Sequence, residues 1–109
     1  MTISTTTLKN AAFAIECDLW TDPATGANYL AKDGAILRRW EPIRDDGDAF
    51  RLAVALKITI EFGHCSIASY KGFADSANLI HAHSYERHDP NELVRMSIVM
   101  AASYIGAAL

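Results

Sequence analysis

The C-terminal segment from Asp89 to Leu109 constrains the fold more than any other part of the chain. Its start carries three helix signals, because Asp89 is a favourable N-cap, Pro90 suits the first turn and Glu92 completes a capping box. No charged residue follows from Met96 onward. Its apolar residues form two stripes at helical spacing, one of Val94, Ile98, Ala101 and Ile105, the other of Leu93, Met96, Met100 and Tyr104. The segment therefore predicts a helix that is buried on two sides.

One face of a sheet can cover only one of these two stripes. A chain of 109 residues offers little further material for the other side. We therefore expect a second subunit to cover the second stripe, which would otherwise expose an apolar patch to water. The expected assembly is a homodimer or larger, with an interface formed by Leu93, Met96, Met100 and Tyr104.

Size and composition predict a single domain that spans residues 1–109, since half of the residues are hydrophobic. The formal net charge of −3 gives no general attraction for a nucleic-acid backbone, so we expect no direct nucleic-acid binding. Cys17 and Cys65 are far apart and form no CxxC pair, which favours a reduced protein in the cytoplasm. The sequence shows no export signal and no stretch of roughly 18 apolar residues that would cross a membrane.

Two local patterns define the first half of the fold. The segment from Ser4 to Thr7 can cap a short helix, whose apolar stripe contains Leu8, Ala11, Ala12 and Ile15. Between Tyr29 and Trp40, two apolar runs flank Asp33-Gly34, the pair that favours a type I′ turn. The sequence therefore predicts a helix, then extended chain, then a β-hairpin.

Three alternating segments, KITIEF, CSIASY and LIHAHSY, predict strands in the second half. A turn at Gly63-His64 would place Ile67 opposite Ile60 and Cys65 opposite Phe62, with Ile58, Ile60 and Phe62 on the buried face. The expected fold class is α+β: a mostly antiparallel sheet of about five strands, packed with about three helices as an α/β sandwich.

The stretch RDDGDAFRLAVAL, from Arg44 to Leu56, is the densest cluster of chemical groups. Its apolar residues share one helical face, so Asp45, Asp46 and Asp48 lie in or just before the first turn. Carboxylates there accept free backbone N–H groups and interact well with the helix dipole. A calcium loop would need ligands at alternating positions and a closing Glu, which this stretch lacks. Helix capping is therefore the preferred interpretation.

Two segments, WEPIRDDGDAFRLAVAL followed by ITIE, and DPNELVRMSIVMAASYIGAA, resemble a family of small proteins encoded by phages and prophages. Members of that family carry the pattern W-N-P-L-x-D-D-G-D-A-x-R-L-A-V-x-L in mid-chain. Their C-terminal helix begins D-P and carries R-R-A-I-V-R-A-A-x-x-I-G. The resemblance covers about a third of the chain, in two blocks in the same order.

The chain departs from the family pattern at Glu41, which replaces Asn, and at Met96 and Met100, which stand where the pattern is basic. Flexible apolar side chains at these two positions suit contact with a partner. The resemblance implies an α/β sandwich made in the cytoplasm of an infected bacterium. It implies no known reaction.

Four histidines are candidates for metal binding or catalysis. His81, His83 and His88 have a spacing that would present two imidazoles from one strand face to a metal, but the ligand set is incomplete. His64 and Cys65 are neighbours on a strand and point to opposite faces, which excludes a Cys–His nucleophile. We therefore expect no metal site, no cofactor and no catalytic residues.

A basic and aromatic cluster is the candidate ligand site. Arg38, Arg39 and Arg44, with Lys32 across the hairpin and Trp40 adjacent, would offer guanidinium forks and an indole plane to an anionic or nucleotide-like ligand. The alternative is a solvated hairpin with the Trp anchored in the core.

These observations favour a non-enzymatic phage or prophage protein that inhibits a host antiviral defence by binding a host protein, as an anti-CRISPR protein does. A sponge that sequesters a nucleotide second messenger is the first alternative, and a His-dependent metal hydrolase is the second. A protein inhibitor would use an exposed apolar patch rimmed by charge, whereas a sponge would use the arginine cluster.

Overall fold

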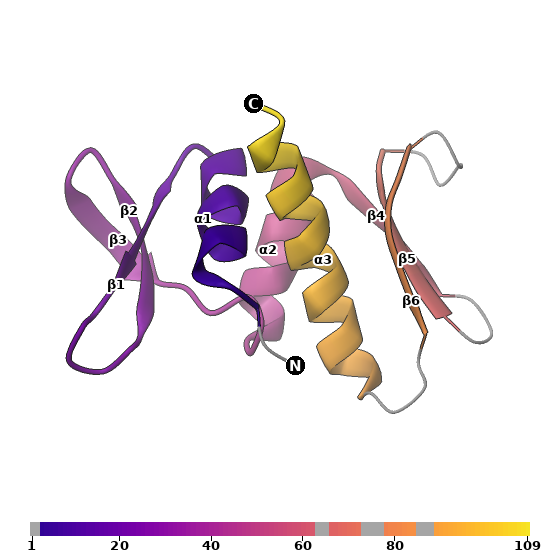
Figure 1. Cartoon of the computed structure of the whole chain (residues 1–109), viewed down its shortest axis with the longest axis horizontal. Helices are drawn as coiled ribbons and strands as arrows, with labels where there is room; N and C mark the ends of the chain where they lie inside the picture. Colours follow the sequence, from indigo (N-terminus) through magenta and orange to yellow (C-terminus); the bar gives the residue numbers. More distant parts are fainter. Residues whose placement is uncertain (1–2, 63–65, 73–77, 85–88) are drawn as a thin grey trace.

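Three helices lie at the centre of the structure, and an antiparallel sheet flanks them on each side (Figure 1). This computed structural model describes residues 3–62, 66–72, 78–84 and 89–109. The helices are α1 (Thr5–Ala14), α2 (Asp46–Leu56) and α3 (Pro90–Ala107). One sheet contains β1 (Asp18–Thr21), β2 (Asn28–Lys32) and β3 (Ala35–Arg39), and the other contains β4 (Ile58–Phe62), β5 (Ser66–Lys71) and β6 (Leu79–Ser84).

The predicted α+β class is confirmed, but the expectation of one sheet with about five strands is wrong. Among the described residues, six strands form two separate sheets of three. The strand that the sequence analysis did not identify is β1, which follows α1 and pairs with β2. Trp20 of β1 packs against Tyr29, its partner on β2, with ring centroids 5.5 Å apart.

The N-terminus of α3 forms as the sequence predicts. The Asp89 carboxylate accepts a hydrogen bond from the Glu92 backbone N–H at 3.1 Å, and Pro90 is the first helical residue. The helix is then buried along most of its length, as its uncharged sequence requires.

The interface expected on α3 is wrong for two of its four residues. Leu93 and Met96 are buried within the chain, where they pack with Ile67 of β5, and Met100 packs at the edge of the same cluster. Tyr104 is the member that is largely exposed. The prediction failed because it assumed one sheet, whereas the second sheet supplies the cover for the second stripe.

Small residues let α1 pack closely against α3. A Cβ atom at Gly106 would lie 1.8 Å from the Asn10 carbonyl oxygen, so only glycine permits this helix crossing. Ala11 and Ala12 of α1 are fully buried in the same core as Ala102. This confirms the predicted stripe of the first helix.

The predicted hairpin between Tyr29 and Trp40 is confirmed. Its two turn residues, Asp33 and Gly34, have φ values of 52° and 80°, the positive values that a type I′ turn requires. A bulge on this hairpin shifts the register between Leu30 and Ala31.

The β4–β5 pair forms, but its register differs from the prediction by two residues. Ile67 pairs with Phe62 instead of Ile60, and Ile60 pairs with Ser69. The same side chains still share a face, because the shift is an even number of residues. The predicted turn at Gly63-His64, and Cys65, lie outside the described residues.

Candidate functional site

The first turn of α2 brings the three aspartates of the RDDGDAFR stretch into different positions. Asp45 is the N-cap, and its carboxylate accepts a hydrogen bond from the Asp48 backbone N–H at 2.8 Å. The predicted capping role is therefore confirmed for Asp45. Asp46 and Asp48 follow within the first turn, where the helix dipole favours their negative charge.

Asp48 is buried and connects three parts of the fold. One carboxylate oxygen accepts from the Arg51 guanidinium at 2.6 Å and lies 3.6 Å from that of Arg38 on β3. The other oxygen accepts from the Glu41 backbone N–H at 2.9 Å. These contacts attach the end of β3 and the following loop to α2, and they satisfy a carboxylate that would be costly to bury alone.

A charged pocket of about 440 Å³ lies beside this connection. The structure brings together the predicted ligand residues Arg38, Arg39 and Arg44, and it adds Arg51, which the sequence analysis did not include. Three carboxylates, those of Glu41, Asp45 and Asp48, complete the lining.

Trp40 does not belong to this pocket. Its side chain is 1% exposed and lies in the hydrophobic core with Leu30 and Leu52. The indole therefore offers no plane to a ligand at the surface, and the alternative interpretation, a Trp anchored in the core, is the one that matches its position. The arginines at 38 and 39 point to solvent because β3 is exposed along its whole length.

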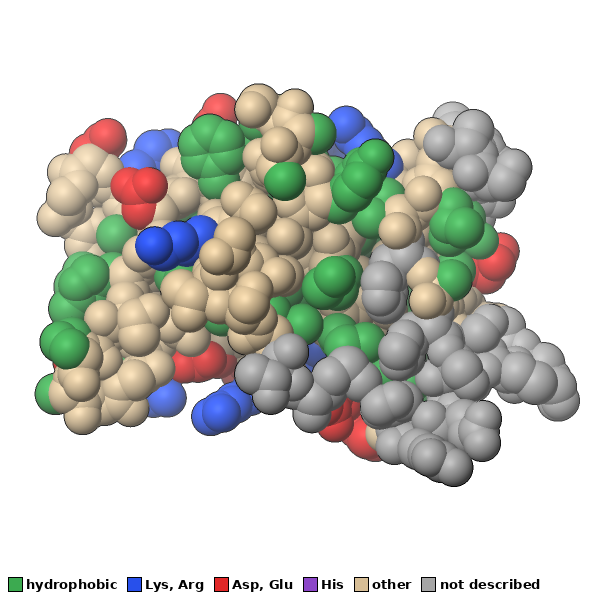
Figure 2. Space-filling view, in the orientation of Figure 1, with side chains coloured by type: hydrophobic (Ala, Val, Ile, Leu, Met, Phe, Trp, Pro, Cys, Tyr) green, Lys and Arg blue, Asp and Glu red, His purple; other side chains and the backbone are tan. Residues whose placement is uncertain are grey.

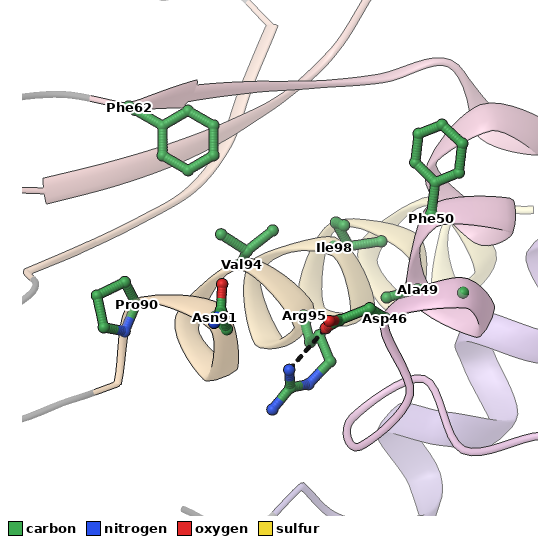
Figure 3. A pocket seen from close by; sticks show the side chains of 10 residues that line it. Asp46, Ala49, Phe50, Phe62, Pro90, Asn91, Val94, Arg95 and Ile98 are labelled. Atoms are coloured by element: carbon green, nitrogen blue, oxygen red, sulfur yellow. Dashed lines mark hydrogen bonds and ion pairs between the residues drawn. The ribbon is translucent and has the colours of Figure 1, made fainter.

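A second cavity, which we call the apolar groove, lies on the other side of the first turn of α2 (Figure 3). It encloses about 550 Å³ between α2, α3 and the end of β4. Val94 and Ile98 of α3 point into it, Phe62 reaches toward it from β4, and Phe50 stands beside it on α2 (Figure 3).

The two phenylalanines are exposed to an unusual degree for residues of their size. Phe50 is 66% exposed and Phe62 is 65% exposed. Val54, one turn after Phe50 on α2, is also exposed and extends the apolar surface along the helix. On the face shown in Figure 2, hydrophobic side chains lie in separate groups among other side chains and backbone, one of them at the edge of the β1–β2–β3 sheet.

Asp46 and Arg95 are the charged residues among the described ones that line the apolar groove. Arg95 of α3 donates to the Asp46 carboxylate at 2.7 Å and to the Ile43 backbone carbonyl at 2.7 Å. The Arg95 side chain is mostly buried, whereas that of Asp46 is 79% exposed. This ion pair joins α3 to α2 and leaves both charges satisfied.

The sequence analysis did not identify the groove, although one signal was present. Phe50 lies outside the apolar stripe of its helix, which contains Ala49, Leu52, Ala53 and Leu56, so a large aromatic side chain had to face away from the core. Phe62 was expected on the buried face of its strand with Ile58 and Ile60. That expectation is wrong, because the helices cover Ile58 and Ile60 but the strand's end extends past them.

The histidine hypothesis falls on parts of the chain that the structure does not describe. His81 and His83 lie on β6, but their side chains, and all of His64 and His88, are outside the described set. Among the side chains that the structure describes, which exclude those of His81 and His83, no three of His, Cys, Asp or Glu lie where they could hold a metal ion.

Comparisons with protein-family models, with curated proteins and with solved structures found no match to this chain. Of the helices in the described part of the chain, none has the length and apolar character needed to span a membrane.

Proposed function

We propose that this protein acts by binding another protein through the apolar groove, without catalysing a reaction. The observation that carries the proposal is the exposure of Phe50 and Phe62, at 66% and 65%, on the two sides of one apolar cavity. Aromatic side chains, phenylalanine among them, are enriched at the centre of protein interfaces, where a few buried side chains carry most of the binding energy.

The lining favours a protein over a small molecule as the occupant. A small-molecule site needs a few polar groups that orient the ligand. Among the described lining residues, the charged side chains, Asp46 and Arg95, bind each other at 2.7 Å, and Asn91 is the one other polar side chain. The exposed Val54 also extends the apolar surface beyond the groove, which suits a larger partner.

The resemblance to phage and prophage proteins suggests the partner and the purpose. We propose that the partner is a protein of a bacterial antiviral defence, present in the cytoplasm of the infected cell, and that binding inhibits it. An apolar surface rimmed by charge is the feature expected of such an inhibitor.

The nucleotide sponge receives less support than the inhibitor. The sponge hypothesis uses Trp40 as the plane on which a base stacks, but Trp40 is buried in the core. The His-dependent hydrolase depends on side chains outside the described residues and stays a hypothesis.

Affinity capture with matched variants tests the proposal. Tagged wild-type protein and the Phe50→Asp and Phe62→Thr variants are used to capture proteins from lysates of defended bacterial strains. We expect both variants to lose a partner that the wild type retains, with at least about tenfold weaker binding to that partner once it is purified. Expression of the wild type, but not of the variants, should restore phage growth on the defended strain.

Phe13→Asp is the matched control, because Phe13 is also an exposed apolar residue, 53% accessible, but lies on α1 away from the groove. If this variant still binds the partner, the loss of binding in Phe50→Asp and Phe62→Thr is due to the groove and not to a general effect of removing an exposed apolar side chain. Equal loss by all three variants, or capture of no partner that depends on Phe50, would contradict the proposal. Light scattering that shows a dimer broken by Phe50→Asp would instead identify a second copy as the occupant.

A further inference from the structure

The charged pocket beside Asp48 contains an arrangement that the protein-binding proposal does not use. Four arginines, Arg38, Arg39, Arg44 and Arg51, line one cavity of about 440 Å³. With the three carboxylates of the same lining, the pocket carries a formal charge of about +1 in a chain whose formal net charge is −3.

The three carboxylates of the pocket are engaged in bonds within the protein. The Glu41 carboxylate accepts from the Asn28 backbone N–H at 3.1 Å, and Asp45 caps α2 through the Asp48 N–H. Asp48 holds Arg51 and Arg38 through one oxygen and the Glu41 N–H through the other. Each acid therefore serves the fold, and none of them occupies the other two arginines.

Arg39 and Arg44 have no such partner. No carboxylate of the described residues forms an ion pair with either guanidinium, and both side chains are exposed. Arg51, by contrast, is held in place: its guanidinium nitrogens lie 3.2 and 3.3 Å from the position that a Cβ of Gly47 would take. The absence of a side chain at Gly47 thus allows Arg51 to lie over the first turn of α2 and toward the pocket.

We propose that this pocket binds a pyrophosphate group, either free or as part of a nucleoside diphosphate. Each guanidinium fork can donate to two oxygens. The guanidinium groups of Arg39 and Arg44 could together donate to about four oxygens. A single carboxylate has only two oxygens, whereas a pyrophosphate has enough for both arginines. Because the lining is entirely Arg, Asp and Glu, it holds the anion and offers no apolar plane to a base.

Isothermal titration calorimetry with sodium pyrophosphate at about 0.15 M ionic strength tests the site. We expect the wild type to bind with a dissociation constant below about 1 mM. Arg39→Gln and Arg44→Gln should each weaken binding about tenfold or more, since each removes a charge-assisted fork. Both variants should fold normally, because neither side chain forms an ion pair with a described residue, and circular dichroism checks this.

Lys9→Gln is the control, because it removes the same charge from an exposed position on α1 outside the pocket. Binding within about twofold of the wild type would support a defined site over general charge attraction. ADP should bind with the affinity of pyrophosphate, since the base gains nothing from the pocket. Absence of pyrophosphate binding, or equal weakening by Lys9→Gln and Arg39→Gln, would overturn the proposal. The Phe50→Asp variant should bind pyrophosphate normally, so the two proposed activities can fail independently.

Discussion

The two sides of the first turn of α2 differ in how they use the same residue type. On the side of the apolar groove, Asp46 is 79% exposed and pairs with Arg95 at the rim. On the side of the charged pocket, Asp48 has a side chain that is 9% exposed and holds two arginines and a backbone N–H. Two aspartates that are two residues apart therefore differ in the number of contacts that they hold, and the difference follows from the burial of Asp48.

The difference explains why one cavity is apolar and the other charged. In the described part of the groove, the charged side chains, Asp46 and Arg95, pair with each other, and Val94, Ile98 and the two phenylalanines are the large apolar side chains. In the pocket, the buried carboxylate organises arginines that would otherwise repel one another. A short, acidic helix start can thus support two surfaces of opposite character.

Replacing Asp48 should have the largest effect on stability. Asp48→Ala removes the acceptor for Arg51 and leaves the Glu41 N–H without its partner, so we expect a loss of about 2–3 kcal/mol in the free energy of unfolding. The loss should stay below that of a fully buried ion pair, because the side chains of Arg51 and Arg38 are 55% and 43% exposed. Urea unfolding measures it. A loss no greater than that of Asp46→Ala would contradict the central role of Asp48.

Replacing the N-cap should have an intermediate effect. Asp45→Ala removes the hydrogen bond to the Asp48 N–H, and caps of this kind contribute about 0.5–2 kcal/mol. Calcium should not raise the melting temperature of the wild type, because the aspartates serve the helix start. A large calcium-dependent rise, abolished in Asp45→Ala, would restore the cation-loop interpretation.

Replacing Asp46 should have the smallest effect. The ion pair with Arg95 involves an exposed carboxylate, and such pairs contribute about 0.2–1 kcal/mol. The effect of Asp46→Asn should shrink further at about 1 M salt, where exposed charges are screened. Unfolding curves at low and high salt measure this. An effect that is independent of salt would mean that Asp46 contributes through packing or a hydrogen bond instead of charge.

Local chemistry was enough to predict where the three helices start and where the hairpin turns, although the sequence did not select the capping residue of the first two helices. Ser4, Asp45 and Asp89 each cap a helix through a backbone N–H three residues later. Asp33-Gly34 likewise forms its turn from the conformational preferences of two residues. These features depend on contacts within a few positions of the chain, which the order of amino acids specifies directly.

Only the tertiary structure decided what covers α3 and which surfaces remain open. The sequence indicates a helix apolar on several sides, but the second sheet, not a second subunit, covers Leu93 and Met96. The burial of Trp40, the exposure of Phe62 and the gathering of Arg51 with the arginines of β3 depend in the same way on segments that are distant along the chain. The amphipathic pattern of a segment determines that a face must be buried, whereas the partner that buries it depends on how all the other segments pack.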